Sequence, residues 1–228
     1  MQCVILAAGK GTRMRPLTET MPKPLIEVCG ETILNHIVEA LPPEITEIIL
    51  VVGYKAEQIK QHCGDVFCGR AVQYVEQENF AGGTGDALLC AKELITGKFL
   101  FMYADDIHGA AALAKVVKEP HGMLAVHSDT PELFGVLTKN EDGTLKGIVE
   151  KPVKPTSDLV NIGGIVAEPK LLEYIVSKSV LGEVYVTDMV TAYAAEHPVQ
   201  IIEQDVWLPV GYPEDIAKAE AVLCPKVD

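Results

Sequence analysis

The chain has 228 residues, of which 48% are apolar and 22% charged, with aromatic residues at 6%. This apolar content excludes a disordered chain, and the length is typical of one large domain. With 19 Lys and Arg against 32 Asp and Glu, the formal net charge is −13. A chain this acidic argues against nucleic-acid binding, because that affinity comes largely from neutralising phosphates.

Strands and helices are expected to alternate through the first half of the chain. Residues 3–8 form a short, continuous apolar run, which predicts a buried parallel strand. Further strands are expected at 48–52, 72–75 and 99–104, and helices at 33–41, 56–63 and 87–94. This alternation predicts an α/β fold with a three-layer, Rossmann-like sheet.

The second half has shorter strands separated by turns. Strands are expected at 123–126, 135–138, 147–149 and 162–166, and helices at 169–176, 186–195 and 213–223. No linker, repeat or low-complexity tract interrupts this series, so we expect one domain over residues 1–228.

Positive charge gathers just after the first strand. Residues 10–23 hold Lys10, Arg13, Arg15 and Lys23 against the single carboxylate of Glu19, in a stretch that contains Gly11 and follows Gly9. In open α/β sheets, ligands bind beyond the carboxyl ends of the strands. Because Asp105 follows the strand at 99–104, the sequence predicts a polyanion site where this loop and Asp105 face one cleft.

The glycine loop differs from the two best-known phosphate loops. Met14 stands where the dinucleotide fingerprint needs a third glycine, and Gly9-Lys10-Gly11 does not supply the Gly-Lys-Ser/Thr of a P-loop. Residues 6–18 (LAAGKGTRMRPLT) and 22–25 (PKPL) instead resemble the signature of the sugar-1-phosphate nucleotidyltransferases.

The resemblance implies a reaction in which a nucleoside triphosphate and a sugar 1-phosphate give a nucleotide sugar and pyrophosphate. Catalysis would then consist mostly of positioning and charge neutralisation. Arg13 would contact the β and γ phosphates, and Lys23 the α-phosphate or the incoming phosphate. The nucleotide-binding backbone would come from Ala8, Gly9, Gly11 and Thr12. Two roles stay open for Arg15: contact with a substrate, or shaping of the loop alone.

A second glycine motif, Gly82-Gly83-Thr84-Gly85, resembles the segment of this family that meets the base and ribose. Gly83 and Thr84 are therefore expected to bind nucleotide. Gln77 resembles the family's base-reading glutamine, with Glu76 and Asn79 as alternatives.

The family's strand-end aspartate binds Mg²⁺, and Asp105 stands at that place. Asp106 is expected to be solvated. The family's second metal carboxylate is replaced by Pro209, which offers only a carbonyl. Either Asp105, phosphates and water hold the metal, or Asp205 or Asp106 contributes, or the chain is a non-catalytic relative that binds sugar nucleotides.

The sugar-side motifs of the family resemble residues around Gly135, Glu150, Lys151 and Asn161. By that resemblance, Gly135, Glu150 and Asn161 would bind sugar hydroxyls and Lys151 the sugar phosphate. Residues 1–110 would form a nucleotide-binding half and residues 111–228 a sugar-phosphate-binding half.

The paired alanines before Gly9 resemble the uridylyl and thymidylyl members of the family more than the guanylyl members, and this resemblance favours UTP or dTTP; the sugar is not specified. The enzyme alternative is a cytidylyltransferase of an alcohol phosphate, against which the Arg-Pro-Leu-Thr run at 15–18 counts. The expected partners are the two substrates, with no nucleic acid and no membrane; homo-oligomerisation stays open. No apolar run of about 18 residues and no export leader is found, so we expect a cytoplasmic protein.

The six cysteines match no paired metal-binding spacing and are expected to be reduced. Many relatives append hexapeptide repeats, which this sequence lacks. It is therefore expected to be either a short stand-alone enzyme or part of a longer one.

Overall fold

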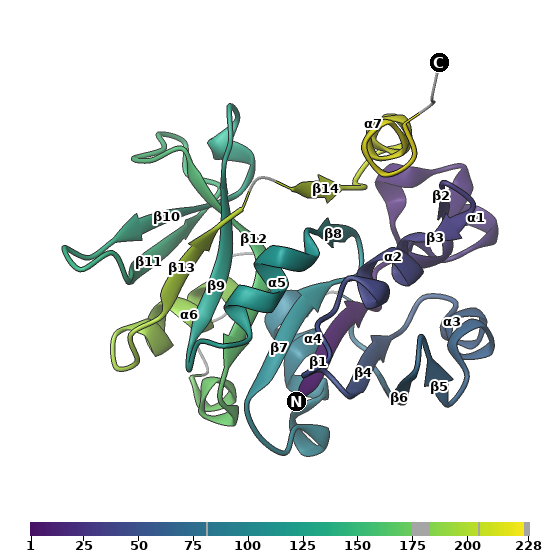
Figure 1. The fold of residues 1–228 in the computed structure, drawn as a ribbon, viewed down its shortest axis with the longest axis horizontal. Helices are drawn as coiled ribbons and strands as arrows, with labels where there is room; N and C mark the ends of the chain where they lie inside the picture. Colours follow the sequence, from purple (N-terminus) through teal and green to yellow (C-terminus); the bar gives the residue numbers. More distant parts are fainter. Residues whose placement is uncertain (81, 175–182, 205, 226–228) are drawn as a thin grey trace.

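The computed structural model describes residues 1–80, 82–174, 183–204 and 206–225. A ten-stranded mixed sheet runs through the molecule (Figure 1). In spatial order its strands are β11 (Leu145–Glu150), β10 (Gly135–Lys139), β12 (Leu159–Ala167), β7 (Phe99–Tyr103), β1 (Gln2–Ala7), β4 (Glu47–Val52), β6 (Arg70–Glu76) and β5 (Val66–Phe67). Beside this row, β9 (Gly122–His127) pairs with β12, and β13 (Gln200–Glu203) pairs with β9.

Strand β1 lies at the centre of the sheet and is apolar on both faces, as expected of a buried parallel strand. It runs parallel to β4 and β7, and β4 runs parallel to β6. The carboxyl ends of these four strands therefore meet at one edge of the sheet.

Helices cover both faces of this sheet. One core cluster joins it to α2 (Ile33–Glu39), α3 (Ala56–Cys63) and α5 (Ala110–Val116). The other cluster joins its opposite face to α4 (Gly83–Cys90) and α6 (Val186–Ala194). The expected three-layer α/β architecture is confirmed.

Several boundaries differ from those expected. The helix expected at 87–94 is α4, which starts earlier at Gly83, followed by the 3-10 turn η3 (Lys92–Leu94). The helix expected at 169–176 is the 3-10 segment η5 (Pro169–Glu173), and residues 175 and 176 lie outside the described part of the chain.

The remaining elements are short, except for the last helix. They are η1 (Thr12–Met14), α1 (Leu17–Thr20), η2 (Lys23–Leu25), β2 (Glu27–Val28), β3 (Glu31–Thr32), β8 (Asp106–His108), η4 (Pro131–Leu133), β14 (Trp207–Pro209) and α7 (Pro213–Leu223). Strands β2 and β3 form a hairpin, and β14 pairs antiparallel with β8.

Strand β12 joins the two parts of the sheet and contains a glycine bulge. Its pairing register with β9 shifts between Asn161 and Ile165. Gly163 and Gly164 have φ values of 79° and 64°, which disfavour any residue with a side chain. Before the bulge β12 pairs with β10, and after it with β7.

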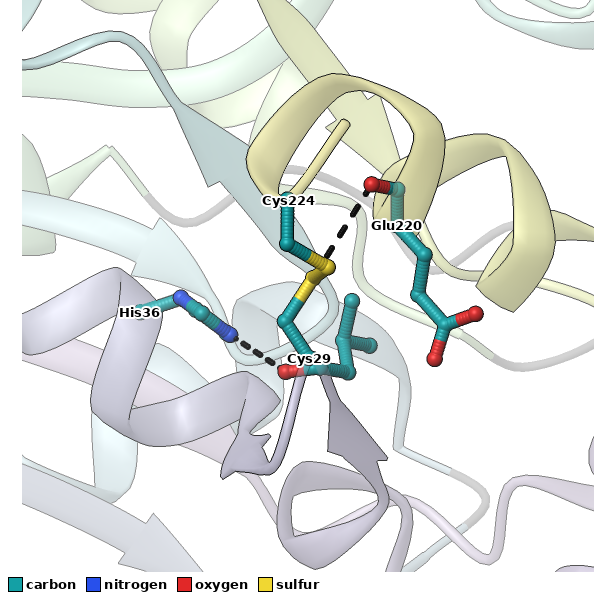
Figure 2. Close-up of a disulfide and its surroundings, with 5 residues drawn as sticks. Cys29, His36, Glu220 and Cys224 are labelled. Atoms are coloured by element: carbon teal, nitrogen blue, oxygen red, sulfur yellow. Dashed lines mark hydrogen bonds between the residues drawn. A yellow bond between two sulfur atoms is a disulfide. The ribbon is translucent and has the colours of Figure 1, made fainter. Parts of the chain in front are cut away.

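A disulfide joins Cys29 in the β2–β3 turn to Cys224 after α7, with Cα atoms 6.1 Å apart (Figure 2). The expectation of six reduced thiols is therefore wrong for this pair. The partners are separated by 195 positions, so no local spacing motif could reveal them. The other four cysteines are free, and burial raises the pKa of Cys63 to about 12.

No helix in the described ranges is both long and apolar enough to cross a membrane.

Candidate nucleotide-binding cleft

A cleft of about 380 Å³ opens at the sheet edge where β1, β4, β6 and β7 end. It contains every residue that the sequence predicted to bind nucleotide or to act in catalysis. These are Ala8, Gly9, Gly11, Thr12, Arg13, Lys23, Gln77, Gly83, Thr84 and Asp105. Predicted residues up to 97 positions apart in the sequence, from Ala8 to Asp105, thus meet at one site.

The glycine loop folds tightly against the residues that follow it. Gly11 has φ 57°, and a Cβ there would lie 3.0 Å from Thr18 and 3.1 Å from Lys23. The Thr18 hydroxyl donates to the Gly11 carbonyl at 2.8 Å, and the Met14 N–H donates to the same oxygen at 2.9 Å. Glycine at position 11 therefore lets Lys23 approach the loop.

Lys23 and Asp105 form an ion pair in the cleft. The Lys23 Nζ donates to Asp105 Oδ2 at 2.6 Å. The lysine is 7% exposed and the Asp105 side chain 35% exposed. The pair therefore brings the end of β7 against η2, and one carboxylate oxygen stays available at the cleft surface.

The cations of the loop have different surroundings. Arg13 lines the cleft, and its guanidinium carbon lies 5.0 Å from the centre of the Tyr212 ring. Lys10 lies with its ammonium 5.4 Å from the centre of the Phe80 ring. Neither Lys10 nor Arg15 is among the described residues that line the cleft.

The second glycine motif forms the first turn of α4. Gly83 has φ 85°, and a Cβ there would come within 2.7 Å of the Val184 carbonyl. The Gly85 N–H donates to that carbonyl at 2.7 Å, and the Val184 N–H donates to the Gly82 carbonyl at 2.8 Å. A further bond runs from the Val186 N–H to the Thr84 hydroxyl at 3.2 Å. The motif is thus fixed by the segment before α6.

Gln77 is buried at the end of β6 and lines the cleft. Its Nε2 donates to Asp86 Oδ2 at 3.2 Å and to the Gly83 carbonyl at 3.4 Å. Glu76, one of the alternatives, is instead paired with Lys60 of α3 at 2.6 Å. Of Gln77 and Glu76, only Gln77 lines the cleft.

Asp106 is half-buried, whereas the sequence led us to expect a freely solvated side chain. Its Oδ1 accepts a hydrogen bond from the Trp207 indole at 3.1 Å, and Pro209 is its partner in the β8–β14 pairing. Burial, followed by the charge of Asp105, raises the pKa of Asp106 well above its usual range. Asp205, the other carboxylate considered, lies outside the described residues.

The expected sugar-binding residues do not line this cleft, but three of them form one row. In the β11–β10–β12 pairing, Gly135 is opposite both Glu150 and Asn161. Glu150 accepts from the Thr187 hydroxyl at 3.3 Å, and burial raises the pKa of Glu150. Lys151 follows this row at the end of β11, on the exposed side, with φ 42°.

Tyr103 connects the row to the cleft, which the sequence did not predict. It lines the cleft, as Thr84 does. Its pKa is raised by burial and then by the charge of Glu150. Phe80 and Gly211 are two more cleft residues without a predicted role, and their apolar or small side chains gave no chemical signal in the sequence.

Comparisons with known proteins agree with this geometry. A family model described as "Nucleotidyl transferase" matches residues 2–225. The chain is 36% identical to the UTP–glucose-1-phosphate uridylyltransferase AglF of Haloferax volcanii, over 98% of this chain and 96% of that protein. It is 34% identical to the bifunctional protein GlmU of Methanocaldococcus jannaschii, over 100% of this chain but 55% of that protein. The chain thus spans about half the length of its GlmU relatives.

Solved structures share the fold. A Bacillus anthracis protein assigned as a glucose-1-phosphate thymidylyltransferase, in complex with sucrose, superposes with a TM-score of 0.87 and 25% identity, over 100% of this chain and 96% of that one. A UDP-glucose pyrophosphorylase complexed with UDP-glucose gives a TM-score of 0.82 at 22% identity, covering 96% of each chain.

Proposed function

The chain belongs to the nucleotidyl transferase family, and we propose that it transfers a nucleotidyl group from a nucleoside triphosphate to a sugar 1-phosphate. UTP or dTTP is the favoured donor. The observation that carries the proposal is the convergence of Arg13, Lys23 and Asp105 with the glycine loop in one cleft. The similarity to AglF over nearly the full length of both proteins supports it.

In the proposed reaction, an oxygen of the sugar phosphate attacks the α-phosphorus of the triphosphate. A new phosphorus–oxygen bond forms while the bond from the α-phosphorus to the bridging oxygen breaks, and pyrophosphate leaves with that electron pair. Little covalent chemistry remains for the protein, so rate comes from alignment and from cations near the developing charge.

This chain supplies those cations from two directions. The Arg13 guanidinium offers a planar donor fork that suits the β and γ phosphates and the leaving pyrophosphate. Lys23, buried beside the glycine loop, offers a point charge to the α-phosphate. Backbone N–H groups of Gly9 and Gly11 can approach the triphosphate because no side chain intervenes.

A divalent metal fits the donor set. Mg²⁺ is usually held by one or two carboxylates together with substrate phosphates and water. Asp105 supplies one carboxylate at the cleft surface, and no group of three or more metal-ligating side chains is found in the described ranges. Asp105 would hold Mg²⁺, which would supply positive charge to the phosphates. With Asp105 as the one carboxylate ligand, metal binding would not need a second carboxylate at position 209, where Pro209 offers only a backbone carbonyl.

For the acceptor sugar, we assign the row of Gly135, Glu150 and Asn161. Carboxylate and amide oxygens accept hydrogen bonds from sugar hydroxyls, and Lys151 at the end of β11 suits the sugar phosphate. Residues 1–110 are the proposed nucleotide-binding half and residues 111–228 the proposed sugar half. A cytoplasmic location is part of the proposal.

The test is pyrophosphate release with Mg²⁺, across UTP, dTTP, CTP, GTP and ATP against several sugar 1-phosphates. One strongly productive pair identifies base and sugar together. Preference for CTP with an alcohol phosphate would favour the cytidylyltransferase alternative. No release from a folded chain that still binds a sugar nucleotide would refute the proposal in favour of a non-catalytic binder.

Two variants locate the chemistry. Lys23→Ala should lower kcat by about 10²–10³-fold, by comparison with loss of one charge-stabilising donor. Asp105→Asn keeps the size of the side chain but removes its charge, so a folded variant should lose Mg²⁺-dependent turnover, with a lower melting temperature because buried Lys23 loses its counter-ion. Arg15→Ala is the matched control, a cation in the same loop outside the cleft. A Lys23→Ala rate equal to that of Arg15→Ala would remove Lys23 from the mechanism.

A further inference from the structure

The C-terminal arm, residues 207–224, returns to the cleft from the opposite end of the chain. Its first strand, β14, pairs with β8 directly after Asp105. The Val210 N–H donates to the Asp105 carbonyl at 2.9 Å, and Gly211 lines the cleft. In Figure 1 the yellow helix α7 lies beside the purple hairpin β2–β3, which follows the glycine loop.

The arm places Tyr212 against Arg13. The ring centre lies 5.0 Å from the guanidinium carbon, within the range of a cation–π interaction. The backbone of Tyr212 is fixed, because its N–H donates to Asp215 Oδ2 at 2.8 Å and the Gly211 N–H donates to the same oxygen at 3.0 Å. Asp215 is held in turn by Lys218 at 2.8 Å.

Arg13 has little else to orient it. Within the described residues, no side-chain hydrogen bond or ion pair holds its guanidinium, whereas Lys23 is paired with Asp105. An unrestrained arginine loses rotamer freedom when it binds a phosphate, and that loss weakens binding. A ring that already holds the guanidinium reduces the loss.

We propose that Tyr212 is a positioning residue that holds Arg13 in the orientation needed to bind the triphosphate. This inference rests on the proposed function, because it assigns Arg13 to the phosphates. The interaction needs the aromatic face and not the hydroxyl, so phenylalanine should replace tyrosine while alanine should not.

The test is a double-mutant cycle of Tyr212→Ala and Arg13→Ala, read as KM for the triphosphate and kcat. Tyr212→Ala should raise KM by about two- to fivefold, the value of an exposed cation–π contact, with a smaller change in kcat. Tyr212→Phe should retain the wild-type KM, and in the Arg13→Ala background Tyr212→Ala should have no further effect. Val222→Ala, on the exposed surface of α7, is the control.

Calorimetric binding of inorganic tripolyphosphate to the same variants separates the two proposals. If the wild-type chain releases no pyrophosphate with any pair but Tyr212→Ala still weakens tripolyphosphate binding, the proposed function fails and the positioning role stands. Unchanged KM and binding in Tyr212→Ala, or effects of the two substitutions that simply multiply, would overturn the positioning role. So would a Tyr212→Phe variant as impaired as Tyr212→Ala.

Discussion

Loss of the disulfide between Cys29 and Cys224 should lower the free energy of unfolding by an amount that follows from its place in the chain. The bond joins positions 195 apart. A cross-link restricts the unfolded chain, and its effect grows with the logarithm of the loop length. For this separation the entropic relation gives about 5 kcal/mol at 25 °C, whereas typical measured values are about 2–4 kcal/mol. We expect the double variant Cys29→Ser, Cys224→Ser to lose about 3–5 kcal/mol.

Urea unfolding followed by tryptophan fluorescence measures this loss. Trp207 is the single tryptophan of the chain, and its ring packs edge-on to Phe134 at a centroid distance of 5.4 Å, so unfolding should change its emission. With a urea dependence of about 3 kcal/mol per molar, the midpoint should fall by about 1 M or more. Cys68→Ser, which removes a free thiol, is the control and should leave the midpoint in place.

Thiol titration of the urea-denatured, unreduced chain provides an independent check. Four of the six cysteines should react, because two are bonded to each other. Six reactive thiols would show that the bond is not formed. An unchanged midpoint in the double variant, with the bond formed in the wild type, would refute the entropic reasoning.

Two further predictions concern stability and the cleft. Burial raises the pKa of Glu150 above its unfolded value, so wild-type stability should fall as the pH rises through the folded pKa. Glu150→Gln removes this titration, so the variant should be more stable than wild type at pH 7. The two proteins should become equally stable below about pH 4. Urea midpoints of the two proteins that run parallel from pH 3 to pH 8 would contradict this prediction. Gly163→Ala places a Cβ 2.9 Å from the Tyr103 ring at φ 79°, and should cost about 1–3 kcal/mol in urea unfolding and raise KM. Gly147→Ala, whose nearest neighbour is at 3.4 Å, is its control, and equal losses in the two variants would exclude a strain effect.

The central strands could be predicted from the sequence because a strand buried on both faces is a nearly continuous apolar run. Strands β8, β13 and β14 were missed because a strand of three or four residues shows no periodicity and is defined only by its pairing partner. The apolar pattern placed the start of α4 at residue 87 instead of Gly83 for another reason. Glycine is a poor helix former, and tertiary contact with Val184 holds that first turn.

The cleft was predicted better than its internal contacts. The glycine loop and Asp105 follow neighbouring strands, so topology alone brings them together. The ion pair of Asp105 with Lys23 and the hydrogen bond from Trp207 to Asp106 depend on side-chain contacts across 82 and 101 positions. No local pattern encodes contacts of that range.

The ion pair between Lys23 and Asp105 has a consequence for how fast a nucleotide is captured. Because the pair is neutral as a unit, Arg13 is the unpaired cation among the described residues that line the cleft, on a chain with a net charge of −13. A triphosphate approaching from a distance is therefore repelled, and this repulsion is screened beyond about 10 Å at 0.1 M ionic strength. Added salt should speed the encounter, which then depends on short-range contacts made once the triphosphate is inside the cleft.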